Sequence, residues 1–209
     1  MNTEFKDMDK AFREILKSIE KNIKPVVKCN TCGACPCRCQ EIEKEKKRKA
    51  ARYQELLMES RIDLFFINND FKVHSPELLP YNNIEWLGKE SLLIYGNPGC
   101  HKTGQITAIA KIVMQAGYSV RYYRATELRY NREDVRNKSM VIIDNTGKAE
   151  CEDKKNELFD LIDYRIHNYR STVLITNENL SSHIAGAFYD RLKLFKHIKI
   201  SGESQRGAK

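Results

Sequence analysis

The chain has 209 residues, of which 31% are charged and 41% hydrophobic, and its formal net charge is +8. This length suits one domain with an appendage, and the apolar share is enough for a packed core. An excess of positive charge favours an anionic partner such as a nucleic acid or a nucleotide. No apolar run approaches the roughly 20 residues of a membrane helix, and the first ten residues lack a signal-peptide segment. We therefore expect a cytoplasmic protein with no membrane partner.

Residues 4–24 carry apolar side chains at helical spacing, and Pro25 ends the pattern. The members of this stripe are Met8, Phe12, Ile15, Leu16, Ile19 and Ile23. The spacing predicts an amphipathic helix whose apolar face covers another surface. Two alternatives stay open: packing on the chain's own domain and docking on a partner.

Five of the seven cysteines cluster behind this segment: Cys29, Cys32, Cys35, Cys37 and Cys39. The first two form a C-x-x-C pair followed by Gly33, and the last two form a C-x-C pair. Two thiolate pairs can wrap one tetrahedral zinc ion, and in a reducing compartment such a cluster favours a metal over disulfides. We expect Cys29, Cys32, Cys37 and Cys39 to bind zinc in a structural knuckle. Spacing alone does not decide that Cys35 is the spare one, and an iron–sulfur cluster or unligated thiols are the alternatives.

The rest of the chain divides into a helix, a linker and a main domain. Residues 40–61 are highly charged and lack Gly and Pro, which predicts a second helix and completes an N-terminal segment, 1–61. Residues 62–90 are irregular and contain two prolines, which predicts a linker. The main domain, 91–209, alternates apolar strands with helices. The strands are expected at 91–96, 118–125, 139–145, 171–177 and 197–202, and the helices at 102–116, 126–134, 153–168 and 180–193.

Continuous apolar strands joined by helical crossovers predict an α/β fold with a parallel sheet flanked by helices. The first strand leads into GNPGCHKT, residues 96–103, which fits the phosphate-binding pattern G-x-x-x-x-G-K-[ST] except at His101. Backbone amides of the loop would cradle phosphates at the start of the next helix. The loop residues are Gly96, Asn97, Pro98, Gly99, Cys100 and His101.

Four polar side chains complete the expected nucleotide site. Lys102 would reach the β and γ phosphates, and Thr103 would bind Mg²⁺. Asp144 ends the third strand and suits the magnesium side of the site. Asn177 ends the fourth strand and suits a role in positioning water or sensing the terminal phosphate. Their order along successive strands predicts a P-loop fold that binds ATP or ADP with Mg²⁺.

Four stretches resemble the DnaC/DnaI-type replicative helicase loaders, a family close to the IstB transposition ATPases. They are CNTCGACPCRCQEIEKEKKR, SLLIYGNPGCHKT, LFDLIDYRIHNYRSTVLITNENL and YDRLKLFKHIKISGESQR. The resemblance implies an AAA+ ATPase domain without a large lid. By position it implies that Arg191 is an arginine finger offered to a neighbouring subunit. It also implies that Arg206 acts near the nucleotide and that Asn177 is a sensor.

In such loaders, the segment after the second strand contacts single-stranded DNA. Here it reads RYYRATELRYNREDVR, in which tyrosines and arginines interleave. Aromatic faces can stack bases while cations hold phosphates, which suits a single strand. The alternative is that alternate residues belong to the sheet core and the arginines are solvated. The predicted DNA contacts are Arg121, Tyr122, Tyr123, Arg124, Arg129 and Tyr130.

The resemblance implies that the N-terminal segment and zinc knuckle bind a hexameric replicative helicase. The ATPase domains would assemble in a ring or spiral on it and help place it on single-stranded DNA. Two other functions remain open: an inhibitory mimic that blocks a helicase or loader, and a transposition helper of the IstB type. The zinc knuckle argues against the helper because the loaders carry a similar one.

Two departures from the loader pattern predict weak or absent ATP hydrolysis with reduced nucleotide binding. A Cβ at His101 strains a loop position that favours glycine, at a cost of order 1–3 kcal/mol, or about ten- to a hundredfold in affinity. Asn145 stands where hydrolytic members carry an acid, and an amide cannot accept a proton from water. A steady-state phosphate-release assay with helicase and single-stranded DNA tests this. Turnover comparable to that of an intact loader would contradict it.

Overall fold

The computed structural model describes residues 32–33, 38–130, 132–146, 152–177 and 187–202. The chain divides into two compact units, Met1–Lys47 and Arg48–Lys209, with the boundary inside helix α2 (Cys39–Glu59). This helix confirms the prediction at 40–61, and its residues 41–49 are exposed. The amphipathic helix expected at 4–24 lies outside the described residues. Among those that are described, no helix has both the length and the apolar character needed to cross a membrane.

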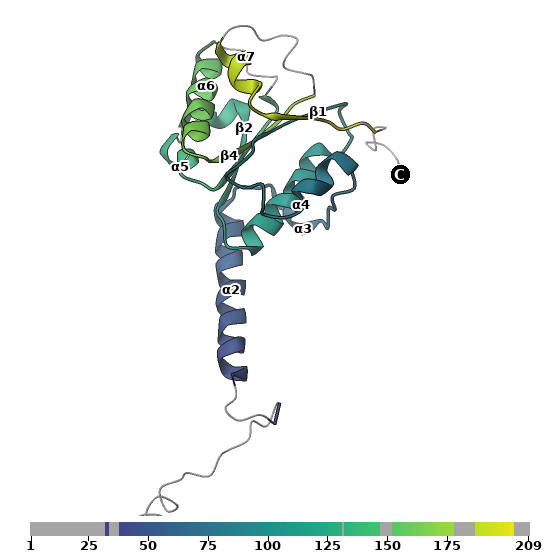
Figure 1. The fold of residues 1–209 in the computed structure, drawn as a ribbon, viewed down its shortest axis with the longest axis vertical. Coiled ribbons are helices and arrows are strands. Elements are labelled where there is room, and N and C mark those ends of the chain that lie inside the picture. The colour runs from purple at the N-terminus through teal and green to yellow at the C-terminus, as the bar shows by residue number, and fades with distance from the viewer. Residues whose placement is uncertain (1–31, 34–37, 131, 147–151, 178–186, 203–209) are drawn as a thin grey trace, which may run out of the picture. The chain divides into compact units, whose positions relative to one another are not determined.

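The second unit is built on a parallel sheet of five strands in the order β2-β3-β4-β1-β5 (Figure 1). The strands are β1 (Leu92–Tyr95), β2 (Val120–Arg124), β3 (Met140–Asp144), β4 (Ser171–Ile175) and β5 (Lys196–Lys199). All five predicted strands and the predicted parallel α/β class are thereby confirmed. The β1 strand lies between β4 and β5. After β1 and the helix that follows it, the chain therefore passes β4 and β3 to reach β2 at the edge of the sheet.

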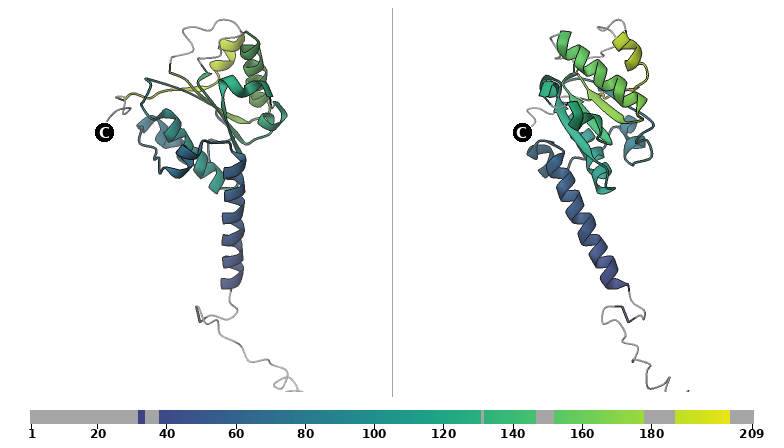
Figure 2. Two further views of the ribbon diagram at one scale, coloured as in Figure 1. Left: turned by 180° about the vertical axis from the view of Figure 1, so that it is seen from behind. Right: turned by 90° about the vertical axis from the view of Figure 1, so that its left-hand side faces the viewer.

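Helices cover both faces of this sheet, as Figures 1 and 2 show. Helix α4 (Lys102–Gln115) lies on one face, and α5 (Arg132–Arg136), α6 (Glu152–His167) and α7 (Ala187–Leu192) lie on the other. The helix expected at 126–134 is instead a 3₁₀ turn, η2 (Ala125–Tyr130), followed by the short α5. Of the helix expected at 180–193, the structure describes α7.

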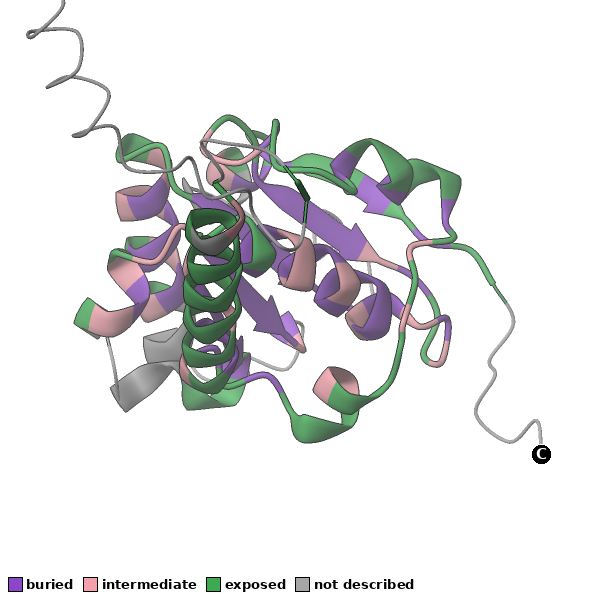
Figure 3. Cartoon of the chain, turned by 90° about the horizontal axis from the view of Figure 1, so that it is seen from below, coloured by how far each residue is buried: buried purple, intermediate pink, exposed green. Residues whose placement is uncertain are grey.

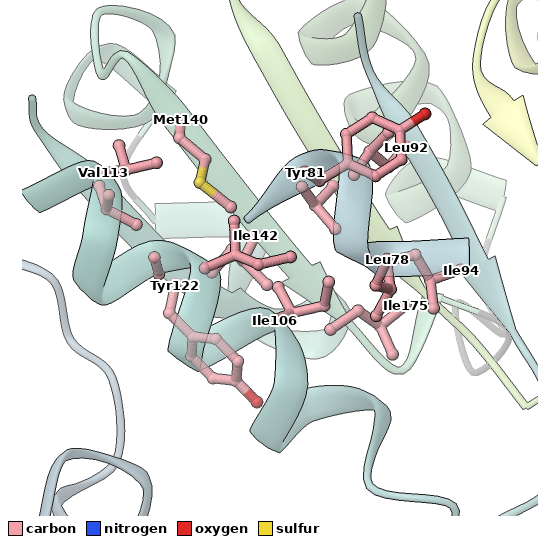
Figure 4. Packing of buried hydrophobic residues seen from close by; sticks show 14 of the residues in the cluster. Leu78, Tyr81, Leu92, Ile94, Ile106, Val113, Tyr122, Met140, Ile142 and Ile175 are labelled. Carbon is pink, nitrogen blue, oxygen red and sulfur yellow. The ribbon is translucent and has the colours of Figure 1, made fainter. Parts of the chain in front are cut away.

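Successive strand residues alternate between two apolar clusters because side chains on a strand point to opposite faces. Ile94, Ile142 and Ile175 pack with Ile106 of α4 on one face (Figure 4). Leu93, Ile143 and Leu174 belong to the cluster on the other face, with residues of α6. The central strands β1, β3 and β4 are almost fully buried, whereas the edge strand β5 is mostly exposed, and Figure 3 shows buried strands in purple between more exposed helices. This two-sided burial explains why the central strands read as continuous apolar runs in the sequence.

The segment 62–90, predicted as a linker, is instead part of the compact second unit. It contains α3 (Leu64–Asn68) and the 3₁₀ turn η1 (Pro76–Tyr81). Leu78, Tyr81 and Trp86 are at most 6% exposed and pack in the α4-side cluster. Single 3₁₀ turns bury isolated side chains without a helical or strand period, so the segment reads as irregular.

The end of α2 also joins this unit, so the predicted boundary at residue 61 does not coincide with the structural one. Leu56 and Leu57 are buried in the α4-side cluster. The carbonyl of Ser60 accepts a hydrogen bond from the Tyr122 amide at 2.8 Å. This bond partly covers the edge of β2, whose outer amides would otherwise be open to water or to another chain.

The buried side chain of Arg165 on α6 links the segments that lead into β3 and β4. Its side chain is fully buried and donates to the carbonyls of Val135, Arg136 and Lys138 before β3, at 2.9–3.1 Å. It also donates to the Ser171 carbonyl at 2.6 Å and to the Thr172 hydroxyl at 2.9 Å, at the start of β4. Burial lowers the pKa of Arg165 to about 9, which leaves it charged at neutral pH. One guanidinium thus joins the starts of two neighbouring strands.

Candidate nucleotide site

The predicted site residues meet at the carboxyl ends of β1, β3 and β4. The loop 96–103 follows β1, Asp144 is the last residue of β3, and Asn177 lies two residues beyond β4. Because the strands are parallel and adjacent in the order β3-β4-β1, these ends share one edge of the sheet. Ligands of open α/β sheets bind at that edge.

The loop closes around the ammonium group of Lys102, which is only 7% exposed. Its Nζ donates to the carbonyls of Gly96 and Asn97 at 2.7 and 2.9 Å and to Oδ1 of Asn177 at 3.0 Å. The three donors of an ammonium group are therefore satisfied, and Lys102 ties the loop to the end of β4. Gly96 has φ 151°, and a Cβ there would collide with the Ile200 carbonyl beside β5. Only glycine fits this close approach.

Asp144 is the second centre of the site. Its Oδ2 accepts hydrogen bonds from the hydroxyls of Thr103 at 2.9 Å and Tyr122 at 2.8 Å, and its Oδ1 accepts from the Asn145 amide at 2.7 Å. Asp144 is 8% exposed, so these bonds compensate for the burial of its carboxylate. The carboxylate and the Thr103 hydroxyl offer the oxygen ligands that Mg²⁺ prefers, and they fit the predicted ion.

Sequence reasoning missed the part played by Tyr122. Burial raises the pKa of Tyr122 above its usual range, the charge of Asp144 adds to the rise, and a hydrogen bond from Arg124 opposes it. The phenol therefore stays neutral and donates to Asp144. Figure 4 shows its hydroxyl pointing away from Val113 and Met140. The sequence gives one signal, the alternation of β2, but alternation names a face of the sheet and not the carboxylate at its edge.

A cavity of about 570 Å³ opens beside the loop. Its lining includes Lys102, Thr103, Asp144 and Asn177, together with Phe65, Phe66 and Phe71 from the segment before β1. Ligand pockets for small molecules fall in this size range. Phe71 packs so closely on α4 that a Cβ at Gly104 would lie 2.6 Å from its ring. Backbone amides at the start of α4 face the same loop, which suits an anionic ligand.

The two residues that depart from the loader pattern both have left-handed backbones. His101 has φ 56° and ψ 28°, as the missing glycine predicted, and Asn145 has φ 58°. Asparagine tolerates this region better than histidine does. His101 makes no side-chain cap for α4, and its ring lies 6.0 Å from that of Phe71. Asn145 lines the cavity and carries no group that can take a proton.

The arginines implied by the loader resemblance lie apart from this cavity or outside the described residues. Arg191 on α7 forms an ion pair with Asp163 of α6, and its side chain is 38% exposed. It is not among the residues that line the cavity. Arg206 lies outside the described residues, so its proposed place near the nucleotide stays a prediction.

Three of the six predicted DNA contacts are in the interior of the domain. Arg121, Tyr122 and Tyr123 are 8%, 5% and 1% exposed. Arg121 pairs with Asp134 and donates to the Glu59 carbonyl, and Tyr123 packs in the α6-side cluster. A base cannot stack on a ring that solvent does not reach, so this part of the segment corresponds to the sheet-core alternative.

The remaining predicted DNA contacts are Arg124, Arg129 and Tyr130. Arg124 is exposed and pairs with Asp63 at 3.1 Å. The side chains of Arg129 and Tyr130 lie outside the described part of the structure. Contact between this segment and DNA stays a prediction.

The predicted zinc ligands fall mostly outside the described part of the chain. Cys32 is exposed and Cys39 partly buried, whereas Cys29, Cys35 and Cys37 are not described. Within the described ranges, no group of three or more His, Cys, Asp or Glu side chains is arranged to hold a metal. The zinc knuckle is therefore still a prediction.

The parallel five-stranded sheet, with the loop 96–103 between β1 and α4, is a fold that the chain shares with solved structures of replication proteins. The chain is similar to a crystal structure of DnaI, with 18% identity and a TM-score of 0.54 over 73% of this chain and 93% of that one. It is also similar to a DnaC helicase loader, with 19% identity and a TM-score of 0.51 over 60% of this chain and 86% of that one. The resemblance to loaders is thus confirmed at the level of the fold.

A third similar structure is the replication initiator DnaA bound to AMPPCP and single-stranded DNA. It shares 15% identity and has a TM-score of 0.55 over 66% of this chain. The chain spans about half the length of two DnaA chains that it matches, 45% of one and 50% of the other. No protein-family model and no curated protein matches the chain.

The left-handed backbone of His101 leads to a prediction about stability. Replacing His101 with Gly should raise the free energy of unfolding by about 1 kcal/mol, because glycine adopts this conformation without a steric cost. His101→Ala is the matched control, since it removes the imidazole but keeps the Cβ. Urea unfolding followed through Trp86, the one tryptophan and a buried one, measures both. A Gly variant no more stable than the Ala variant would show that the backbone is not strained.

Proposed function

We propose that this protein is a replicative helicase loader that uses nucleotide binding rather than rapid hydrolysis. The observation that carries the proposal is the assembled site: Lys102, Thr103, Asp144 and Asn177 converge beside a cavity of about 570 Å³. Loaders named DnaI and DnaC have a similar fold. A DnaA with a similar fold binds AMPPCP, a nucleoside triphosphate analogue, which supports a nucleotide as the ligand here.

Each residue has a role in holding nucleotide and Mg²⁺. The loop amides and the ammonium of Lys102 bind phosphate oxygens, so Lys102 exchanges part of its present contacts with Gly96, Asn97 and Asn177 for the ligand. Thr103 and Asp144 hold the magnesium side, and Tyr122 fixes the orientation of the carboxylate. Asn145 leaves no acid next to Asp144 to polarise water, which supports weak or absent hydrolysis.

We propose that different segments of the chain bind the helicase, other copies of the chain and single-stranded DNA. Residues 1–61 would bind a hexameric replicative helicase. Copies of the second unit would associate in a ring or spiral on it, with Arg191 released from Asp163 to face the neighbouring subunit's nucleotide. The segment after β2 would contact single-stranded DNA through Arg129 and Tyr130. The net charge of +8 supports an anionic partner.

A loading assay tests the function. The full chain should capture replicative helicase in a pull-down and transfer it to primed single-stranded DNA. Removing residues 1–38 should abolish capture, because it deletes the helicase-binding part before α2 and spares the second unit. Arg191→Gln should keep capture but reduce loading if the arginine acts between subunits.

Each other outcome selects a different function. Capture followed by blocked loading supports the inhibitory mimic, and failure to capture helicase removes both replication functions and leaves the transposition helper.

Zinc is proposed on the cysteine spacing alone, with Cys29, Cys32, Cys37 and Cys39 as ligands. Elemental analysis of the purified full chain should find zinc at about one ion per chain, the content of a single four-thiolate site. Cys32→Ser should lose the metal because a tetrahedral site needs all four thiolates. Cys35→Ser is the matched control and should keep it. Iron in place of zinc, or equal metal loss in both variants, would contradict this ligand set.

A further inference from the structure

Asp144 and the ion pair between Arg124 and Asp63 line one cavity. Asp144 accepts a hydrogen bond from the Tyr122 hydroxyl at 2.8 Å, and Arg124 follows Tyr122 by two residues on β2. Arg124 in turn donates to Asp63 through Nη2 at 3.1 Å. Arg124 and Asp63 both line the cavity that Lys102 and Asp144 line. The last residue of β2 is therefore part of the candidate nucleotide site.

Lys102 and Arg124 are the two Lys or Arg side chains among the described residues that line the cavity, and their surroundings differ. Lys102 is buried and fully hydrogen-bonded by neutral oxygens. Arg124 is half-exposed, with a side-chain exposure of 51%, and so is Asp63 at 48%. An ion pair at such exposure is weak, so little free energy holds Arg124 to Asp63.

We propose that Arg124 binds the terminal phosphate of a nucleoside triphosphate from the same subunit, and that Asp63 competes with this phosphate for the guanidinium. The proposal rests on the nucleotide site proposed above and names how that site distinguishes a triphosphate from a diphosphate. Arg124 pairs in register with Asp144, which lies on the proposed magnesium side of the loop. Magnesium in P-loop sites bridges the β and γ phosphates, so the terminal phosphate belongs on that side.

The chemistry favours the exchange. A guanidinium binds phosphate through two parallel hydrogen bonds, which are stronger than its bonds to neutral groups. The terminal phosphate carries more negative charge than the Asp63 carboxylate. A triphosphate in the cavity therefore attracts Arg124 and repels Asp63. The same placement reassigns Arg124 from the predicted DNA contacts to the nucleotide.

Two substitutions that break the same ion pair separate this role from a structural one. Arg124→Gln should weaken binding of ATP with Mg²⁺ by about tenfold, the value of a lost charge-assisted bond, and leave ADP within about twofold. Asp63→Asn should strengthen ATP binding by about two- to fivefold, because it removes the competitor and a like charge. If the pair served only to hold the fold, both variants would lose affinity together.

The measurement is titration calorimetry of the full chain with ATP and with ADP, each with Mg²⁺. Arg170→Gln is the control, because Arg170 is exposed and precedes β4 at the opposite edge of the sheet. Single-stranded DNA binding is measured on the same variants without nucleotide. The expected result is opposite changes in the ATP-to-ADP affinity ratio for Arg124→Gln and Asp63→Asn, with no change for the control.

Every other result is decisive as well. An ATP-to-ADP ratio that neither variant changes, or that both change in the same direction, overturns the role of Arg124 and leaves nucleotide binding intact. Loss of DNA affinity in Arg124→Gln without a change in that ratio returns Arg124 to the DNA contacts. A wild-type chain that binds neither ATP nor ADP overturns the nucleotide site itself and this inference with it.

Discussion

The parallel pairing of β4 with both β1 and β3 is the constraint on which the site depends. It sets Ile94 beside Ile175 and Ile175 beside Asp144. The loop after β1, the carboxylate of Asp144 on β3 and the side-chain amide of Asn177 beyond β4 therefore lie side by side at the carboxyl edge of the sheet. Their hydrogen bonds follow from this register: Lys102 reaches Asn177, and Thr103 reaches Asp144. A shift by one residue would turn Asp144 to the other face of the sheet and break the second contact.

The site holds its shape through internal contacts. Lys102 is satisfied by loop carbonyls and by Asn177, and both oxygens of Asp144 are occupied. Such satisfaction lowers the cost of burying two charged groups and keeps their side chains in place for a ligand. The hydrogen bonds of this network and the packing of α4 offset the cost of the left-handed backbone at His101.

The segment before β1 links the site to the rest of the chain. Phe71 packs against Gly104, Gln105 accepts hydrogen bonds from the amides of His74 and Ser75, and Asp63 pairs with Arg124. Sequence reasoning predicted a linker here because isolated buried side chains on 3₁₀ turns have no period to detect. The same limit applies to Tyr122. The tyrosines and arginines around it predicted a contact with DNA, whereas tertiary packing directs its hydroxyl to Asp144.

Local pattern was sufficient for the elements that fold by their own periodicity. The five strands, α2, α4 and α6, and the loop from Gly96 to Thr103 follow from apolar runs, helical spacing and the phosphate-binding motif, because each signal lies within a few residues of sequence. Only the tertiary structure decided which face Tyr122 and Arg121 occupy, that Arg165 joins the starts of β3 and β4, and that Arg124 shares a cavity with Lys102. Those contacts join residues from 6 to 62 positions apart, and their partners are set by the order of strands in the sheet, which no local pattern encodes.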